Sequence, residues 1–254
     1  MNLEKKPSIS IFFPFLNDWG TVGSLLALAI SSVSKLTDDW EVIIVNDGSE
    51  KSDREALEMI TSVINSKFET RNSRQGKTRI RIIDHKENRG YGGALRSGFA
   101  AATKDLIFYT DCDAQYDPRE FSKLFAALKP DTGMVNGYKI KRNDPIHRII
   151  MGRLYHHLVK LAFNLPIRDT DCDFRLVRRK VFDKVKLFEN TGTICVELVR
   201  KIDYHGYNIA EVPVNHFWRT SGKSQFFNIN RLLGTALNLA RLWKKLMIDG
   251  NYDR

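Results

Sequence analysis

Apolar runs of strand length alternate with polar loops along the first half of the chain. Four such runs cover residues 8–13, 40–45, 79–84 and 106–110, and each ends in a polar loop. Segments with apolar residues at helical spacing follow the first three runs, at residues 22–36, 53–64 and 94–102. This repetition of strand, loop and helix indicates an α/β fold with a doubly wound, mostly parallel, Rossmann-like sheet.

The second half continues with further expected strands and helices. The strand-like segments are residues 133–138, 174–177 and 209–218, and the helix-like segments are residues 146–165, 197–206 and 228–247. No linker or internal repeat divides the sequence. We therefore expect a single domain over residues 1–254.

Polar side chains follow the carboxyl ends of the expected strands. In a doubly wound parallel sheet these ends meet at one edge, and ligands bind outside that edge. The residues that we expect to converge there are Asn17, Asp18, Asp47, Asn88, Arg89, Asp111 and Asp113.

Asp111-Cys112-Asp113 is the sharpest local motif. Two carboxylates one residue apart at a strand end can supply oxygen ligands to a divalent cation that also binds a diphosphate. An isolated pair of this kind also serves as turn and helix-capping residues. Because the pair follows an apolar strand and precedes Gln115 and Pro118, we favour the metal-binding interpretation.

Two further loops fit a nucleotide site. Asp47 ends a buried run and can accept a hydrogen bond from a base N–H, although Asp before Gly48 is also a common turn. The glycine-rich loop at residues 88–93 can bring backbone amides to phosphate oxygens, with Arg89 adding positive charge. Such loops also arise for purely steric reasons. Together the three loops favour a nucleotide diphosphate site.

The composition narrows the classes of protein. With 43% hydrophobic and 28% charged residues, disorder and collagen-like repeats are excluded. A net charge of +10 indicates an anionic partner, and nucleic acid, a phosphorylated small molecule and an anionic membrane all qualify. Three cysteines without a C-x-x-C pair indicate a reducing cytosol. We expect no signal peptide and no spanning helix, because no apolar run approaches ~20 residues.

The order and spacing of several motifs resemble the family-2 inverting glycosyltransferases of GT-A fold. The first set is Pro14-x-x-Asn17-Asp18, Val45-Asn46-Asp47-Gly48-Ser49, Asn88-x-Gly90-x-Gly92 and Asp111-x-Asp113-x-Gln115-x-x-Pro118. The later set is Gly137-Tyr138-Lys139, Asp169-Thr170-Asp171-Cys172-Asp173-Phe174-Arg175-Leu176 and Gly222-Lys223-Ser224. This later set resembles the branch that contains dolichyl-phosphate mannose synthase and polyprenyl-phosphate glucosyltransferases. The resemblance covers residues 8–226.

The resemblance implies a division of labour along the chain. Residues 1–118 form a half that binds the nucleotide sugar, residues 119–226 form the acceptor-binding half, and residues 227–254 form a C-terminal amphipathic helix and tail. The implied donor-binding residues are Pro14, Asn17, Asp18, Asp47, Asn88, Arg89, Gly90, Asp111, Asp113 and Gln115. Within this set, Asp47 reads the base, and Asp111 with Asp113 holds Mg²⁺ or Mn²⁺ against the diphosphate of a UDP- or GDP-sugar.

The implied reaction is a single displacement with inversion, from the nucleotide sugar to a polyprenyl phosphate. The alternative acceptor is a sugar hydroxyl of a cell-surface glycan. A phosphate monoester arrives largely ionised because its second pKa is ~6, whereas a hydroxyl needs a general base. Asp173 is therefore either a catalytic carboxylate near the acceptor or, with Asp169, a residue that orients basic groups. The candidate catalytic residues are Asp173, Asp113 and Asp169, and the candidate phosphate-binding residues are Lys139, Arg142, Arg175, Arg219, Lys223 and Ser224.

The last expected helix carries an apolar stripe beside basic residues. The stripe is Leu232, Leu233, Ala236, Leu237, Ala240, Trp243 and Met247. It fits packing on its own domain or on a second subunit, and equally an anionic membrane, where a lipid-linked acceptor is found. We expect a cytoplasmic protein, peripheral at the cytoplasmic face of the membrane. A basic nucleic-acid-binding protein and a non-catalytic scaffold remain the alternatives of a different class; no nucleic-acid-binding motif accompanies the charge.

Overall fold

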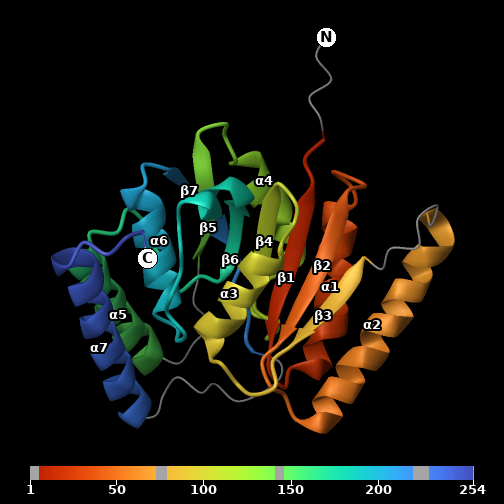
Figure 1. Ribbon diagram of the computed structural model, residues 1–254, viewed down its shortest axis with the longest axis horizontal. Coiled ribbons are helices and arrows are strands. Elements are labelled where there is room, and N and C mark those ends of the chain that lie inside the picture. Colours follow the sequence, from red (N-terminus) through yellow and green to blue (C-terminus); the bar gives the residue numbers. More distant parts are fainter. Residues whose placement is uncertain (1–5, 73–78, 141–145, 220–228, 254) are drawn as a thin grey trace.

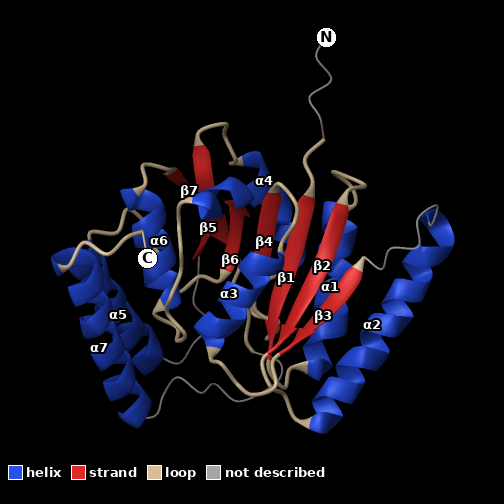
Figure 2. Cartoon of the chain, in the orientation of Figure 1, coloured by secondary structure: helices blue, strands red, loops and turns tan. Residues whose placement is uncertain are grey.

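The computed structural model describes residues 6–72, 79–140, 146–219 and 229–253, and it shows a sheet between two layers of helices (Figures 1 and 2). The strands are β1 (Ile9–Phe15), β2 (Trp40–Asn46), β3 (Ile80–Asp84), β4 (Leu106–Thr110), β5 (Thr132–Lys139), β6 (Phe174–Arg178) and β7 (Asn208–Val214). The α-helices are α1 (Trp19–Val33), α2 (Lys51–Asn72), α3 (Tyr91–Ala101), α4 (Phe121–Ala126), α5 (Ile146–Phe163), α6 (Ile194–Tyr204) and α7 (Ile229–Trp243).

The strands follow the order β3-β2-β1-β4-β6-β5-β7 within the described residues. The neighbours from β3 to β4 pair in parallel, as do β5 and β7, whereas β6 runs antiparallel to β4 and β5. The predicted doubly wound, mostly parallel sheet is therefore confirmed. Strands β2 and β4 lie on opposite sides of β1, so the order in which strands are added to the sheet reverses at β1. In such sheets ligands bind at the point of reversal.

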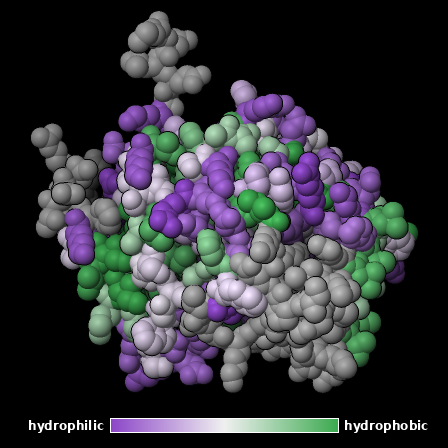
Figure 3. Space-filling view, turned by 180° about the vertical axis from the view of Figure 1, so that it is seen from behind, coloured by the Kyte–Doolittle hydropathy of each residue, from purple (hydrophilic) through white to green (hydrophobic). Residues whose placement is uncertain are grey.

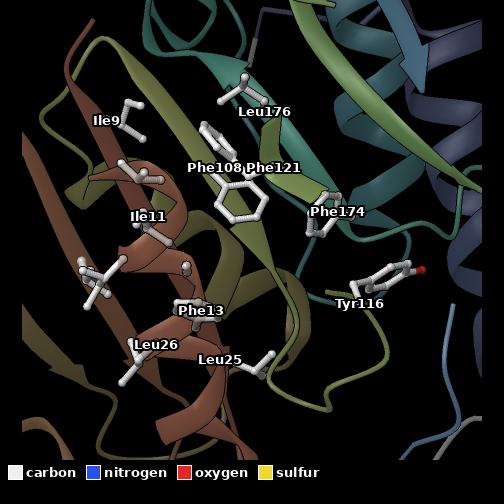
Figure 4. Close-up of a cluster of buried hydrophobic side chains, with 14 of the residues drawn as sticks. Ile9, Ile11, Phe13, Leu25, Leu26, Phe108, Tyr116, Phe121, Phe174 and Leu176 are labelled. Atoms are coloured by element: carbon white, nitrogen blue, oxygen red, sulfur yellow. The ribbon is translucent and has the colours of Figure 1, made fainter. Parts of the chain in front are cut away.

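Alternate residues of β1 point into two apolar cores on opposite faces of the sheet. Ile11 and Phe13 pack with α1 and with Phe108 of β4, in the core that Figure 4 shows. Phe12 faces α3 on the other side and meets the ring of Phe99 edge-on at 5.0 Å. Because β1 is buried on both faces, it reads as a continuous apolar run in the sequence.

The end of β7 differs from the prediction in a way that bears on the site. The expected strand extended to Trp218, but β7 ends at Val214. The chain then leaves the sheet and lies against the loop after β4, where the Phe217 amide donates to the Gln115 carbonyl at 2.9 Å. The Gln115 side chain donates back to the Phe217 carbonyl at 3.2 Å. These two bonds replace strand pairing and bring residues 215–219 to the strand-end edge.

Helix α7 forms where the sequence predicts it, but its packed face differs from the predicted stripe. The buried residues are Leu242, near the end of α7, and Leu246, in the helical turn just after it, and both pack in the core shared with α5 and α6. Leu233 and Leu237 of the predicted stripe are 63% and 59% exposed. Among the described residues, no helix has the length and apolar character needed to span a bilayer.

Candidate active site

The loops after β1, β2 and β3 meet at one edge of the sheet, where these strands converge (Figure 2). Asn17 has a left-handed backbone, with φ of 57°, which turns its side chain toward the loop after β2. Its carbonyl oxygen Oδ1 accepts from the Glu50 amide at 2.9 Å, and its own amide donates to Ser49 Oγ at 3.1 Å. The predicted convergence of these strand-end residues is therefore observed for the first two loops.

Asp47 lies in this edge with its side chain only 5% exposed. Its Oδ1 accepts from the Arg89 amide at 2.9 Å and lies 2.6 Å from His85 Nδ1. The neighbouring Gly48 has φ of +74°, and a Cβ there would lie 2.7 Å from the Asn88 nitrogen. Glycine is required at this position because the loop after β3 passes directly over it.

The glycine-rich loop is fixed from inside the protein. The Arg89 amide donates to Asp47, the Gly90 amide to Asn88 Oδ1, and the Gly92 amide to the Asn190 carbonyl at 2.9 Å. A Cβ at Gly92 would lie 2.5 Å from the Glu189 carbonyl oxygen. These three amides already have acceptors, so the structure favours the steric explanation of this loop over direct amide contacts to phosphate.

Asp111 and Asp113 follow β4 and form the acidic centre of the edge. Tyr91 OH donates to Asp111 Oδ1 at 2.8 Å, and Arg219 pairs with Asp113 Oδ2 at 2.7 Å. Burial raises the pKa of Asp111 well above its ordinary value, and the charges of Asp173 and Asp113 raise it further. Burial likewise raises the pKa of Asp113, against the lowering effect of Arg219. Carboxylates crowded in this way gain from a cation between them.

The donor set suits a divalent cation shared with a ligand. Within the described ranges, no group of three or more His, Cys, Asp or Glu side chains is arranged to hold a metal ion. Mg²⁺ and similar hard cations commonly use one or two protein carboxylates, several waters and substrate phosphates. Asp111 and Asp113 provide two oxygen donors of this kind, so the residues present fit such a cation.

Asp18 borders the same group of charges. It is half-buried at the start of α1. Burial raises its pKa to about 6; Arg219 opposes this shift, while the charges of Asp113 and Asp53 add to it. Asp18 therefore borders the acidic centre, as expected for the first strand-end loop.

Asp173 and Asp169, both predicted as candidate catalytic residues, have different surroundings. Asp173 Oδ1 accepts from Cys195 Sγ at 3.1 Å and from Tyr109 OH at 3.5 Å, and its charge acts on Asp111. Asp169 lies 3.5 Å from Lys139 Nζ and is buried. Asp173 thus belongs to the acidic centre, whereas Asp169 holds its loop to the end of β5.

The predicted phosphate-binding cations also lie in different surroundings. Arg175 is fully buried and donates to the carbonyls of Cys172 and Thr170, at 3.1 and 2.6 Å. The Lys139 side chain is 7% exposed and donates to the Asp171 carbonyl at 2.7 Å. Both cations therefore donate to backbone carbonyls of the loop at residues 169–173 from inside the protein. The predicted direct contact with a ligand phosphate would require that loop to open.

Arg219 is the predicted cation that reaches the acidic centre, with its side chain 32% exposed. The remaining phosphate-binding candidates, Arg142, Lys223 and Ser224, lie outside the described residues. Of the other donor candidates, Pro14 lies within β1 opposite Val45, and Gln115 is engaged with Phe217. Asn88 caps the Gly90 amide.

Four residues of the site were missed by sequence reasoning: His85, Tyr91, Asn190 and Cys195. His85 directly follows β3, so the strand-end rule that selected Asp47 could have selected it too. Tyr91 opens α3 beside the glycines. Asn190 and Cys195 come from a loop and helix about 100 residues further along, and no local pattern marks them.

Sequence comparison assigns most of the chain to a known family. The model of the family described as "Glycosyl transferase family 2" matches residues 10–186. An undecaprenyl-phosphate 4-deoxy-4-formamido-L-arabinose transferase of Pseudomonas fluorescens is 26% identical over 220 residues, which cover 86% of this chain and 60% of that protein. Glycosyltransferase AglD of Haloferax volcanii is 23% identical over 255 residues, covering 97% of this chain and 38% of that protein. The chain thus spans less than two thirds of either relative.

Solved structures share the fold. Glucosyl-3-phosphoglycerate synthase from Mycobacterium tuberculosis, in complex with phosphoglyceric acid, superposes with a TM-score of 0.67 at 16% identity over 94% of this chain and 79% of that one. The same enzyme in complex with Mn²⁺, UDP and glucosyl-3-phosphoglycerate gives 0.62 at 17% identity, over 96% and 79% of the two chains. These likenesses confirm the GT-A fold that the sequence motifs predicted.

Proposed function

Because the chain belongs to glycosyl transferase family 2, we propose that it moves a sugar from a UDP- or GDP-linked donor to a polyprenyl phosphate. The observation that carries this proposal is the meeting of Asp47, Asp111, Asp113 and Asp173 around one strand-end edge. The names of the relatives support the lipid phosphate as acceptor, since several are undecaprenyl-phosphate sugar transferases. A sugar hydroxyl of a surface glycan is the alternative acceptor.

In this proposal the donor lies along the edge from β2 to β4. Asp47 would accept a base N–H, and Asp111 with Asp113 would hold Mg²⁺ or Mn²⁺. Such a cation would stabilise the negative charge that develops on the departing nucleoside diphosphate. Complexes of the structural neighbour that contain Mn²⁺ with UDP, or Mg²⁺ with UDP, support this choice of ligand and metal.

The protein's own residues prepare the leaving group and the acceptor. Arg219 stands 2.7 Å from Asp113 and can pair with the diphosphate when that carboxylate binds the cation. We assign Asp173, which Cys195 and Tyr109 hold, to the anomeric region because its charge acts on Asp111. An ionised phosphate acceptor attacks without a strong base, whereas a hydroxyl acceptor would depend on Asp173 for proton removal.

Product analysis tests the transfer reaction. The protein is incubated with Mn²⁺, undecaprenyl phosphate and radiolabelled UDP-glucose or GDP-mannose, and the organic phase is counted before and after mild acid. We expect an acid-labile, lipid-soluble product that is lost in Asp113→Asn. Glu58→Gln, which changes a 53%-exposed carboxylate on α2, is the matched control and should retain activity. If no donor in a panel of UDP- and GDP-sugars yields a lipid-soluble product, the polyprenyl phosphate acceptor is refuted.

Asp173 separates the two acceptor classes. With a phosphate acceptor, Asp173→Asn should lower kcat moderately and leave the shape of the pH profile unchanged. With a hydroxyl acceptor, the same variant should remove the acidic limb of the profile, because the general base is lost.

An apolar face on α5 and α7 supports attachment at a membrane surface. Leu158 and Leu161 of α5 are 60% and 83% exposed, and Leu233 and Leu237 of α7 are similarly exposed. The two helices lie side by side (Figure 1), and Trp243 Nε1 donates to the Ala162 carbonyl at 2.8 Å between them. Apolar side chains appear at the corresponding edge of the space-filling view (Figure 3).

Basic residues accompany this apolar face. Arg241 and Lys244 are exposed on α7 and on the π-helical turn Lys244–Ile248 that follows it. Exposed leucines beside basic residues are typical of helices that lie on anionic membranes. We therefore place the protein peripherally, at the cytoplasmic surface where a nucleotide sugar and a lipid phosphate meet.

Vesicle sedimentation tests this placement. We expect the protein to sediment with vesicles that contain phosphatidylglycerol and less with neutral phosphatidylcholine vesicles. Leu161→Asp combined with Leu237→Asp should abolish sedimentation. Met59→Asp is the matched control, since Met59 is 71% exposed on α2, far from this face. Equal binding by the double variant and the control would refute the placement.

A further inference from the structure

His85 links two consecutive strand-helix units at the donor edge. It follows β3, its Nδ1 lies 2.6 Å from Oδ1 of Asp47 after β2, and its Nε2 lies 2.8 Å from Ser97 Oγ in α3. The side chains of His85 and Asp47 are 3% and 5% exposed. A carboxylate oxygen can only accept a hydrogen bond, so Nδ1 carries a proton and donates a hydrogen bond to Asp47. Ser97 fixes the other side of the ring, because its hydroxyl can donate to Nε2 or accept from it.

The contacts of Asp47 are unequal between its two oxygens. Oδ1 receives both the His85 imidazole and the Arg89 amide. Throughout the described part of the chain, no hydrogen bond reaches Oδ2, which leaves that oxygen as the acceptor for a ligand. A carboxylate with one oxygen fixed by two donors cannot rotate freely, so the direction of the second oxygen is determined before any ligand arrives.

From this arrangement we infer that His85 is a positioning residue for base recognition. It fixes the Asp47 carboxylate so that Oδ2 accepts the ring N–H of uracil or guanine, and Ser97 fixes His85 in turn. This inference rests on the proposed function, since it assigns Asp47 to the base of a nucleotide donor. It concerns the base alone, because His85 has no contact with Asp111 or Asp113 among the described residues.

Base selectivity is the readout that separates positioning from general stability. Uracil and guanine present a ring N–H where cytosine and adenine present a lone pair, so a fixed carboxylate distinguishes UDP from CDP and GDP from ADP. We would measure Kd by calorimetry in Mn²⁺ for these four nucleotides and for inorganic pyrophosphate, which has no base. The proteins are wild type, His85→Phe, His85→Asn and Ser97→Ala, each with its thermal unfolding midpoint.

The variants differ in what they keep. His85→Phe removes the donor to Asp47 and should weaken the preferred nucleotide about 10- to 100-fold, the effect of losing one hydrogen bond to a charged group. It should leave pyrophosphate within about twofold and collapse the preference for N–H bases. His85→Asn, whose Nδ2–H can replace Nδ1–H, should recover most of the selectivity. Ser97→Ala should lower the base selectivity by a smaller factor than His85→Phe does.

Each outcome bears on a defined claim. If wild type binds neither UDP nor GDP with Mn²⁺, the proposed function fails. If wild type binds, and folded His85→Phe and Ser97→Ala keep its base selectivity or lose pyrophosphate binding equally, the assignment of His85 fails alone. If His85→Phe does not fold, His85→Asn and Ser97→Ala decide: retained selectivity in the first with reduced selectivity in the second supports the assignment, and unchanged selectivity in both overturns it.

Discussion

Removing one partner of the buried ion pair between Glu197 and Lys201 should cost the fold several kcal/mol, and the effect should extend to the donor edge. The two side chains lie one turn apart on α6, 3.1 Å from each other, and both are fully buried. Glu197 also accepts from the Phe188 and Glu189 amides, at 3.0 and 2.9 Å, and Lys201 donates to the Lys186 carbonyl. The pair therefore fixes the loop at residues 186–190.

Removing one partner leaves the other charge buried without its counter-charge. Burial raises the pKa of Glu197 and lowers that of Lys201, so each group depends on its neighbour to remain ionised. Breaking such a pair typically costs ~3–5 kcal/mol, whereas replacing both partners costs much less. We expect Lys201→Met and Glu197→Gln each to destabilise by about 3–5 kcal/mol, and the double variant by at least ~2 kcal/mol less than their sum.

Urea unfolding monitored by circular dichroism measures these values. Arg200→Met is the control on the same helix, because its partner Asp203 is partly exposed and the pair should contribute only ~0–1 kcal/mol. A coupled, buried ion pair is refuted if the free energy of unfolding of either single variant lies within about 1 kcal/mol of wild type, or if the two effects simply add. Since Asn190 holds the Gly92 amide, destabilising this loop should also weaken nucleotide binding.

Three further predictions follow from the same edge. Gly92→Ala places a Cβ 2.5 Å from the Glu189 carbonyl oxygen and should weaken UDP binding about tenfold or more, measured by calorimetry. Tyr91→Phe removes the donor to Asp111 and should raise the Mn²⁺ concentration needed for half-maximal activity about 3- to 10-fold, with little effect on UDP binding without metal. The pKa of Asp18 is about 6 in the folded protein, above the ordinary value of 3.8 for an aspartate. The folded state therefore binds this proton more tightly than the unfolded state does, and the free energy of unfolding falls as pH rises from about 4 to 6. In EDTA, this loss of unfolding free energy should be about 1 kcal/mol after solvent screening and should be absent in Asp18→Asn. The same pH dependence of unfolding free energy in Asp18→Asn and wild type would contradict the raised pKa of Asp18.

Much of the sheet was predictable from sequence because β1, β2 and β4 are buried on both faces. Burial of alternate residues into two cores produces the continuous apolar runs at β1, β2 and β4, and each run ends where polar residues must begin. The same reasoning found Asp47, Asp111 and Asp113, since parallel strands bring their carboxyl ends to one edge. Local pattern and overall fold agree at these positions.

Burial of charged residues was not predictable, because it depends on packing between distant segments. Arg175 and Lys139 have the sequence context of phosphate ligands, yet both donate inward to the loop at residues 169–173. Likewise, the glycines of the loop after β3 pack against Asn190, a contact about 100 residues away. Neither feature has a local signal, since the amino acids involved are equally common on surfaces and in turns.

The sequence by itself determined the strand-helix order, the parallel sheet and the set of carboxylates at its edge, because hydrophobic periodicity and strand-end polarity are local consequences of burial. The tertiary structure alone decided which atoms of those carboxylates are already occupied. Asp47 offers one oxygen rather than two because His85 and Arg89 arrive from the next strand-helix unit. It also decided that Leu242 of α7 and Leu246 of the π-helical turn after it, rather than Leu233 and Leu237, form the packed side of this helical segment. A helix can turn either apolar side inward, and the neighbouring elements determine which one is buried.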